Sequence, residues 1–157
     1  MDTTTEHGNS SDKLLTKVVC ICGEHESVYM QHVEDLLNSQ PTSWNEFFTL
    51  DSLLDEVKEG KMQAWLYLEN DVAWGLGLTS LLQYPIGKVL RLHFVTCKNF
   101  FKIAKMLSVI ELHARKLDIK YVEGNLHPTL AKYVAKEHGY QSPGVYMFKN
   151  LNKERLM

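Results

Sequence analysis

Polar and apolar residues alternate with a period of two in short stretches of the chain, which is the spacing of a β-strand. The pattern is clearest over 88–95 (KVLRLHFV). In this stretch the predicted faces are Leu90, Leu92 and Phe94 on one side and Val89, Arg91, His93 and Val95 on the other. Further strands are predicted over 14–22, 62–69, 73–84, 120–123 and 141–149.

Between these stretches the apolar spacing changes to the three- and four-residue steps of an amphipathic helix. Helices are predicted over 26–37, 51–59, 100–117 and 128–138. Asn99 is expected to cap the third helix, and Ser43 or Thr49 the second, because their side-chain oxygens can accept backbone N–H groups. Pro128 suits the first position of the last helix, and Gly139 suits the left-handed position after its end.

The order of these elements predicts the fold class. Consecutive strands joined by short turns favour antiparallel pairing, whereas the strand–helix–strand crossover after residue 88 favours a parallel pair. We expect an α/β fold with a mixed, mostly antiparallel sheet of about six strands and helices on both faces. Residues 1–12 lack apolar anchors and are predicted to be a disordered tail, followed by one domain over 13–152 and a tail over 153–157.

Composition and charge narrow the classes of function. With 157 residues, 45% of them hydrophobic, the chain is long enough for one domain with its own core. Its 17 Lys and Arg against 19 Asp and Glu give a net charge of −2, which argues against nucleic-acid binding. No apolar run approaches the roughly 20 residues that span a bilayer, and the polar start does not resemble a signal peptide. Three cysteines without a disulfide spacing fit a reducing compartment, so the cytoplasm is expected.

The junction between strand 88–95 and the next helix is the first candidate for chemistry. Unpaired N–H groups and the positive end of the helix dipole at this point can attract an anion. Lys98, Asn99 and Lys102 would complete a phosphate site there. The same residues would equally serve as a helix cap flanked by solvated lysines.

Three titratable residues near or just after the ends of predicted strands are candidates for acid–base chemistry. His93 has an unperturbed pKa of about 6.5, which suits a general base. Glu123 and His127 flank Asn125, and a carboxylate with an imidazole can relay a proton. Alternatively, His93 only lines one side of the sheet, and 124–128 is a turn followed by a helix start.

The cysteines have a structural as well as a functional interpretation. Cys20 and Cys22 share a strand face near His25 and His32, which hints at zinc. Four ligands at a known spacing are not visible, however. Buried small apolar residues are the favoured interpretation, and no metal site is predicted.

The central strands carry aromatic residues and glycines. Trp65, Tyr67 and Glu69 share one face, where they would line an acceptor cleft or an interface, or pack against the two N-terminal helices. Gly75 and Gly77 inside a strand indicate a bulge or a close approach of another backbone.

The whole pattern resembles the GNAT fold of the Gcn5-related N-acetyltransferases. The resemblance covers roughly residues 14–149. It rests on GKMQAWLYLENDVAWGLGLTSLL for the central hairpin, KVLRLHFV for the strand beside acetyl-CoA, and HPTLAKYVAKEHGYQ for the last helix. In detail the chain is similar to small GNAT-like proteins of tailed bacteriophages, through FFTLDSLLDEVKEGKMQAW to LLQYPIGKVLRLHF and through ELHARKLDIKYVEG.

This resemblance implies acetyl-CoA as the cofactor and a small-molecule or protein amine as the acceptor. It implies catalytic roles for His93 and Glu123. The cofactor-binding residues that it implies are Phe94, Val95, Thr96, Lys98, Asn99, Phe100, Lys102 and Asn125.

Two features of the family have no counterpart in this sequence. The family's glycine-rich loop corresponds to 96–102, which contains no glycine, although glycine lets backbone N–H groups approach a diphosphate. The family's tyrosine before the Gly-aromatic pair corresponds to Ala135, and Tyr133 points to another side of the helix.

Two functions therefore stay open. The first is a GNAT-like N-acetyltransferase with a degenerate diphosphate loop. The second is an inactive GNAT-fold phage protein that acts as a binding, virion-associated or assembly factor on a phage or host protein. In either case we expect a cytoplasmic monomer or homodimer, in the host cytoplasm if phage-encoded, with no nucleic-acid or membrane partner.

Overall fold

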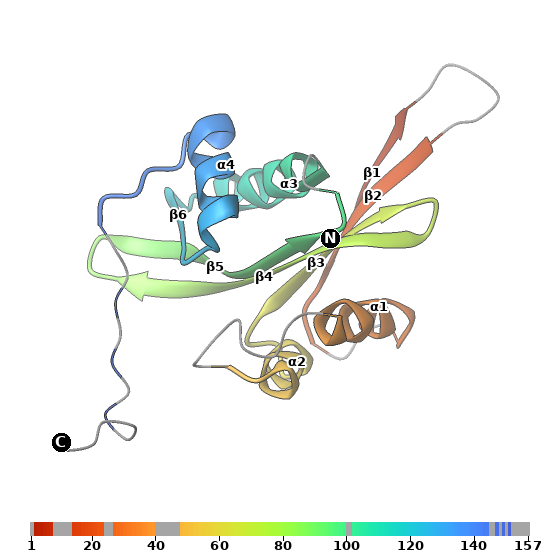
Figure 1. The fold of residues 1–157 in the computed structure, drawn as a ribbon, viewed down its shortest axis with the longest axis horizontal. Helices are drawn as coiled ribbons and strands as arrows, with labels where there is room; N and C mark the ends of the chain where they lie inside the picture. Colours follow the sequence, from red (N-terminus) through yellow and green to blue (C-terminus); the bar gives the residue numbers. More distant parts are fainter. Residues whose placement is uncertain are drawn as a thin grey trace. The chain divides into compact units, whose positions relative to one another are not determined.

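The computed structural model describes residues 2–7, 14–23, 27–39, 48–99 and 102–144, together with residues 147, 149 and 151. The chain divides into two compact units, residues 1–124 and 125–157. The described elements of the first unit are β1 (Asp2–His7), β2 (Leu14–Ile21), α1 (Ser27–Asn38), α2 (Leu50–Lys58), β3 (Gln63–Glu69), β4 (Val72–Tyr84), β5 (Gly87–Cys97), α3 (Ile103–Lys116) and β6 (Tyr121–Gly124) (Figure 1). The second unit contains α4 (Pro128–His138).

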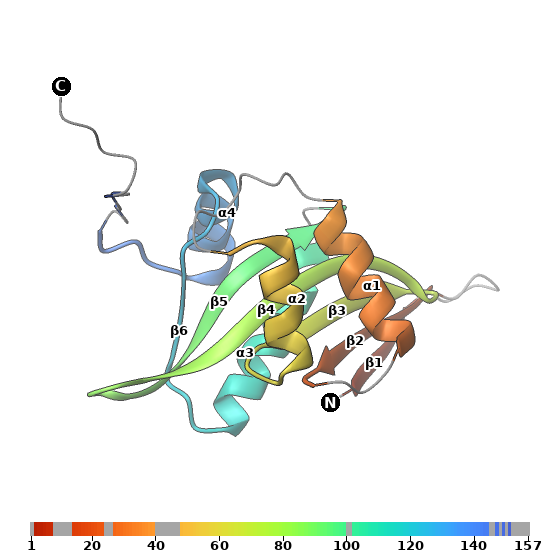
Figure 2. The same cartoon turned by 90° about the horizontal axis from the view of Figure 1, so that it is seen from below.

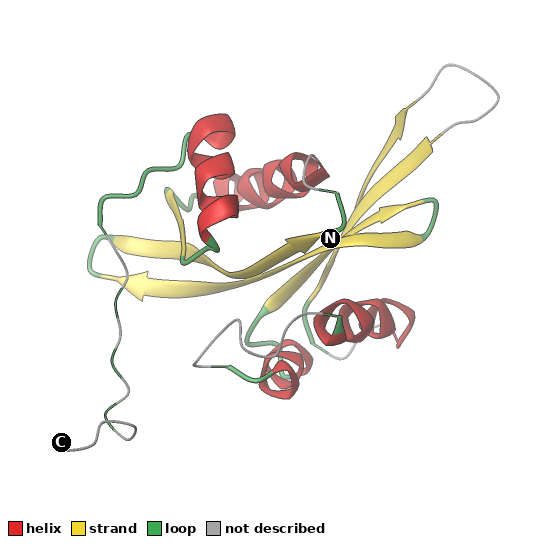
Figure 3. Ribbon diagram, viewed as in Figure 1, coloured by secondary structure: helices red, strands yellow, loops and turns green. Residues whose placement is uncertain are grey.

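Six strands form one sheet within the described residues, in the order β1-β2-β3-β4-β5-β6 (Figure 3). Neighbouring strands are antiparallel from β1 to β5, whereas β6 pairs in parallel with β5. Helix α3 provides the crossover from β5 to β6, because two parallel strands cannot be joined by a tight turn. The predicted mixed, mostly antiparallel sheet is confirmed.

The first strand of the sheet was not predicted. We expected 1–12 to be disordered, but Asp2–His7 forms β1 and pairs antiparallel with β2. The run Thr3-Thr4-Thr5 explains the difference, because β-branched residues favour a strand and the edge of β2 offers unpaired backbone groups. The other residues of the predicted tail lie outside the described residues.

The last predicted strand, over 141–149, is absent at its described positions. Residues 141–144, 147 and 149 are not in a strand, and Val145 and Phe148 lie outside the described residues. The segment Ser142-Pro143-Gly144 gives a physical reason. Proline has no N–H for a ladder, and Ser142 Oγ donates to the Gly144 carbonyl at 3.2 Å, which bends the chain.

Helices α1 and α2 cover one face of the sheet, and α3 covers the other (Figure 2). The main core lies under α1 and α2. Its members include Val19, Ile21, Val33, Leu36, Leu37, Leu53, Val57, Ala64, Leu66, Leu68, Leu76, Leu78 and Phe94. Alternation along β3 then directs Trp65, Tyr67 and Glu69 to the α3 face, where the Trp65 ring meets His113 edge-on at 5.1 Å. The alternative in which these three residues pack against the N-terminal helices is therefore wrong.

Glycines in β4 allow close approach on that face. A Cβ on Gly77 would lie 3.4 Å from Ile110 Cδ1 of α3. A Cβ on Gly75 would lie 3.2 Å from both the Thr96 carbonyl oxygen and Cys97 Sγ. The close approach of another backbone is confirmed for Gly75, whereas Gly77 makes room for a side chain of α3.

The N-terminal caps of the first unit follow the prediction at one helix and depart from it at another. Thr49 caps α2, because its Oγ1 accepts from the Ser52 N–H while Ser52 Oγ accepts from the Thr49 N–H. Ser43 lies outside the described residues. Asn99 does not cap α3: its carbonyl accepts from the Lys102 N–H at 3.0 Å, and Lys102 is the N-cap. The chain makes this extra turn before the helix begins.

The second unit begins and ends its helix as predicted. Pro128 occupies the first turn of α4, and Gly139 closes the helix at a φ of 73°, in the left-handed region. His127 is the N-cap, and its Nδ1 accepts from the Thr129 N–H at 3.2 Å.

Candidate functional site

One extra residue in β5 shapes the candidate site. Strands β4 and β5 pair Leu78 with Phe94 and Thr79 with Leu92, so His93 has no partner in this ladder. Such a β-bulge bends the strand and re-aims a side chain. The His93 ring meets Phe48 edge-on at 5.8 Å, and Phe48 packs against the core under α1 and α2. His93 therefore lies on the α1/α2 face, as Arg91 does two residues earlier.

The bulge also changes the predicted faces of β5. Leu92 pairs with Thr79, whose hydroxyl accepts from Trp65 Nε1 on the α3 face. Phe94 instead belongs to the core under α1 and α2. The predicted faces are therefore wrong for Phe94 and for Val95, which pairs with Gly77 on the α3 face, because one inserted residue reverses the alternation beyond it.

Five polar residues gather around the bulge on the α1/α2 face. Ser80 on β4 is in register with Arg91 on β5, which is in register with Glu123 on β6. His93 Nε2 lies 2.6 Å from Ser80 Oγ. The Tyr84 hydroxyl donates to Glu123 Oε1 at 2.5 Å, and Arg91 Nη1 donates to the same oxygen at 3.3 Å. We call Ser80, Tyr84, Arg91, His93 and Glu123 the bulge cluster.

Burial and the charge of Arg91 favour a neutral imidazole at His93. Burial lowers the pKa of His93 from its ordinary value, Arg91 lowers it further, and Glu123 acts in the opposite direction. The hydrogen bond to Glu123 raises the pKa of Tyr84, so this phenol stays protonated and continues to donate. The cluster thus combines a neutral base with a carboxylate that two donors hold in place.

Strand β5 extends beyond its partner β6 at this point. The described pairing ends with Leu92 opposite Gly124, whereas β5 continues to Cys97. Phe94, Val95 and Thr96, which the sequence predicts as cofactor-binding residues, lie in this extension. Phe94 is only 7% exposed, so it would contribute through its backbone. An extended ligand can bind such an edge through main-chain hydrogen bonds.

The predicted phosphate-binding residues after β5 are engaged within the protein. The Lys102 ammonium forms an ion pair with the Glu69 carboxylate, and the Tyr67 hydroxyl donates to the same carboxylate oxygen at 2.9 Å. The Lys98 N–H donates to the Trp74 carbonyl at 2.8 Å. Asn99 is exposed, and Phe100 lies outside the described residues.

The remaining predicted site residues lie in the second unit. Asn125 is exposed at its start, just after Glu123 and β6. His127 caps α4 through its ring nitrogen. The alternative interpretation of His127, as part of a helix start, is therefore confirmed.

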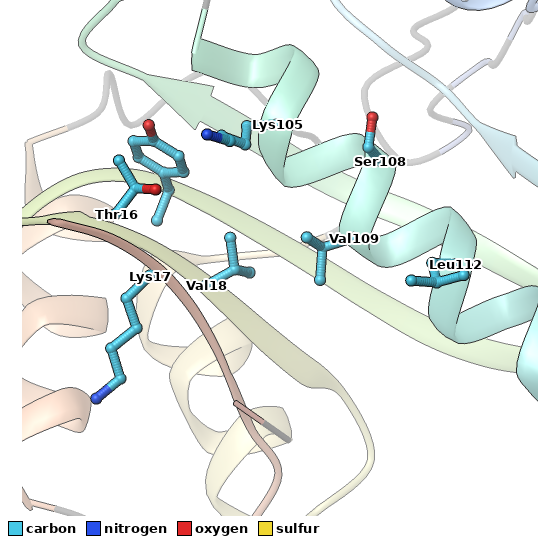
Figure 4. A pocket seen from close by; sticks show the side chains of 8 residues that line it. Thr16, Lys17, Val18, Lys105, Ser108, Val109 and Leu112 are labelled. Carbon is cyan, nitrogen blue, oxygen red and sulfur yellow. The ribbon is translucent and has the colours of Figure 1, made fainter. Parts of the chain in front are cut away.

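A separate hollow of about 210 Å³ opens on the α3 face of the sheet, between β2, β3 and α3 (Figure 4). Its lining residues are Thr16, Lys17, Val18, Tyr67, Lys105, Ser108, Val109 and Leu112. The Lys17 ammonium turns away from it and donates to the Tyr29 hydroxyl at 3.1 Å. The bulge cluster lies on the opposite face of the sheet.

Among the described residues, no group of three or more His, Cys, Asp or Glu side chains is arranged to hold a metal ion. No helix in the described part of the chain is long and apolar enough to cross a membrane.

Comparison with solved structures identifies the fold. The aminoglycoside N-acetyltransferase AAC(6′)-Iy in complex with CoA matches with a TM-score of 0.69 and 13% identity, over 90% of this chain and 98% of that one. A predicted acetyltransferase with acetyl-CoA from Clostridium acetobutylicum matches with a TM-score of 0.63 and 14% identity, over 90% and 99%. The ribosomal-protein-alanine N-acetyltransferase from Brucella melitensis biovar Abortus 2308 matches with a TM-score of 0.62 and 10% identity, over 87% and 98%. The chain has the GNAT fold.

The GNAT fold predicted from the sequence is thus confirmed. At these identities the shared property is the fold. No protein-family model matches the sequence, and no curated protein matches it either.

Two residues of the bulge cluster, Ser80 and Tyr84, are not predicted from the sequence, although Ser80 is a polar residue in an apolar run and is only 8% exposed. Glu69 was noted only for its strand face, although a carboxylate at the end of an apolar strand suggests a buried partner. The pairings of these residues depend on register between strands, which the sequence does not display.

Proposed function

We propose that this protein is an N-acyltransferase that transfers an acyl group from a thioester to an amine bound on the α1/α2 face. One observation carries the proposal. His93, the inserted residue of the bulge in β5, lies on the same face as Glu123, beside the point where β5 extends beyond β6. The similar GNAT-fold structures include N-acetyltransferases in complex with CoA or acetyl-CoA, which supports a donor of this class.

The residues present fit one part of acetyl-CoA and not another. The extended edge of β5 over 93–97 suits the extended thioester arm, which can pair with a strand edge. The described residues of the loop after it do not suit the diphosphate, because Lys102 is already paired with Glu69 and no glycine occurs over 96–102. A bound thioester would supply the acyl group, and the bulge cluster would bind the acceptor amine and remove its proton.

The chemistry that we assign to the bulge cluster is removal of a proton from the amine. With hydrogen on Nε2, His93 donates to Ser80 Oγ, and Nδ1 carries the lone pair that accepts the amine proton. Burial favours this neutral form at pH 7. Glu123 attracts a cationic acceptor and offers a second route for its proton to water. Backbone N–H groups near Val95 would polarise the acyl carbonyl. As the C–N bond forms, the C–S bond breaks and the donor leaves as a thiolate, which takes a proton from water or from the imidazolium of His93.

Calorimetric titration of the full chain with acetyl-CoA tests the donor. Saturable binding with a dissociation constant below about 1 mM, equivalent to about −4.1 kcal/mol, is expected. An acceptor screen then follows, in which His93→Ala and Glu123→Ala should each lower turnover by roughly a hundredfold or more. Lys61→Ala, an exposed residue, is the matched control. No binding at millimolar donor, or unchanged turnover in both variants, would overturn the proposal.

A second candidate is an inactive GNAT-fold protein that binds a phage or host protein. The Lys102–Glu69 pair and the absence of glycine over 96–102 favour this candidate, because both lower the affinity expected for a nucleotide cofactor. It predicts no donor binding in the titration and a specific protein captured by the tagged chain. A monomer or homodimer in the cytoplasm stays a prediction for both candidates.

A further inference from the structure

A buried carboxylate lies beside the junction where GNAT-fold enzymes are expected to hold a donor phosphate. Glu69, at the end of β3, is 7% exposed and forms an ion pair with Lys102, the N-cap of α3. The Tyr67 hydroxyl donates to the same oxygen of Glu69 at 2.9 Å. The Trp74 ring lies 4.7 Å from the Lys102 ammonium, and the ring and the carboxylate together surround that cation.

In this arrangement Lys102, at the start of α3, is already engaged and cannot serve as a phosphate ligand. Lys102 already neutralises one carboxylate, and a second anion beside Glu69 would meet a like charge at low dielectric. The Lys98 N–H is committed to the Trp74 carbonyl at 2.8 Å, and the Lys98 ammonium lies over the same ring at 5.9 Å. The Glu69 carboxylate thus engages the lysine that a donor phosphate at this junction would need.

We propose that Glu69 sets the donor specificity, so that the protein recognises the pantetheine arm of an acyl thioester and not the diphosphate of CoA. This inference rests on the proposed N-acyltransferase function, because it concerns the same donor site. The arm binds along the extended edge of β5, where main-chain groups recognise it irrespective of charge. The ligand class is therefore a pantetheine thioester, either free or as the arm of CoA with its nucleotide end left in solvent.

Titration of the full chain with pantetheine and with CoA separates these two forms. The wild-type protein should bind both with dissociation constants within about threefold of each other. A CoA affinity more than about tenfold higher than that for pantetheine would overturn the inference while leaving the proposed function intact. This comparison needs no variant and so does not depend on the folding of a mutant.

Glu69→Gln supplies the sharper test, because glutamine keeps the shape and the Tyr67 hydrogen bond but removes the charge. The freed Lys102 should raise CoA affinity on the order of tenfold and leave pantetheine affinity unchanged. Adding Lys102→Met to this variant should abolish the gain. Glu59→Gln is the matched control, since Glu59 pairs with Lys61 at 2.9 Å on the surface, and it should change neither affinity.

The outcomes distinguish this inference from the proposed function. Equal changes for pantetheine and CoA in Glu69→Gln, or no change in either, would overturn the role of Glu69. No binding of either ligand at millimolar concentration would overturn both proposals. Equal binding of the two ligands without acyl transfer to any amine would overturn the proposed function and support the inference about the site.

Discussion

Deletion of His93 tests whether this residue is an insertion in an otherwise regular ladder. Leu92 already faces α3 and Phe94 already faces α1 and α2, with Thr79 and Leu78 as their partners. Removing the residue between them would join two neighbours whose faces alternate correctly. The sheet should therefore tolerate the deletion, although the candidate base is lost.

The expected cost follows from the contacts that His93 makes. The hydrogen bond with Ser80 contributes about 1 kcal/mol, and the edge contact with Phe48 about 0.5–1.5 kcal/mol. A regular ladder regains part of this loss. We expect the deletion to lower the free energy of unfolding by about 1–3 kcal/mol and to abolish acyl transfer.

Deletion of Leu90 is the matched control, because it removes one residue from the same strand without closing the bulge. Lys88 would move into the position of Val89, which is 2% exposed, and Val89 would replace Leu90, which is 1% exposed. An unpaired buried ammonium costs about 3–5 kcal/mol, and the lost methylene adds about 1 kcal/mol.

Urea unfolding followed by tryptophan fluorescence measures both deletions. The midpoint of the His93 deletion should lie well above that of the Leu90 deletion. Equal midpoints would refute the assignment of His93 as the inserted residue, because the faces on its two sides would then not match.

Three further predictions concern the same sheet. Stability should fall as the pH drops from 7.5 to 5.5, because burial lowers the pKa of His93 and the unfolded chain binds the proton more readily below about 6.5. The urea midpoint of His93→Gln should change less over this range. An equal change in the variant would contradict the assignment of this pH dependence to His93. Thr79→Val should lower the free energy of unfolding in urea by about 1–3 kcal/mol, since it removes the hydroxyl that accepts from the buried Trp65 Nε1–H at 2.9 Å. A loss below about 0.5 kcal/mol would show that this hydrogen bond contributes little to stability. Gly75→Ala should lower the thermal midpoint of unfolding more than Gly77→Ala. A Cβ at position 75 meets a backbone oxygen at 3.2 Å, whereas a Cβ at position 77 meets a flexible side chain at 3.4 Å. The reverse order of the two midpoints would refute this account.

Local features of the site were accessible to sequence reasoning because they depend on nearest neighbours. Thr49 is one of the two caps that the sequence predicts for α2, because a hydroxyl before an apolar run satisfies the first N–H groups of a helix. Gly139 was recognised because left-handed backbone favours glycine. His93 and Glu123 were chosen as candidates from their positions near strand ends, and the structure places both on one face.

The sequence by itself determined the hydrophobic periodicity, and with it the order of the elements from β2 to α4 and the mixed sheet, because amphipathic spacing is a property of adjacent residues. Only the tertiary structure decided the register. The bulge at His93 leaves the local alternation on each side intact, so it becomes visible only against β4. The pair between Glu69 and Lys102 joins residues 33 positions apart, and β1 forms against an edge that exists only once β2 is in the sheet. These features depend on contacts that form only when distant segments meet, so the sequence does not display them.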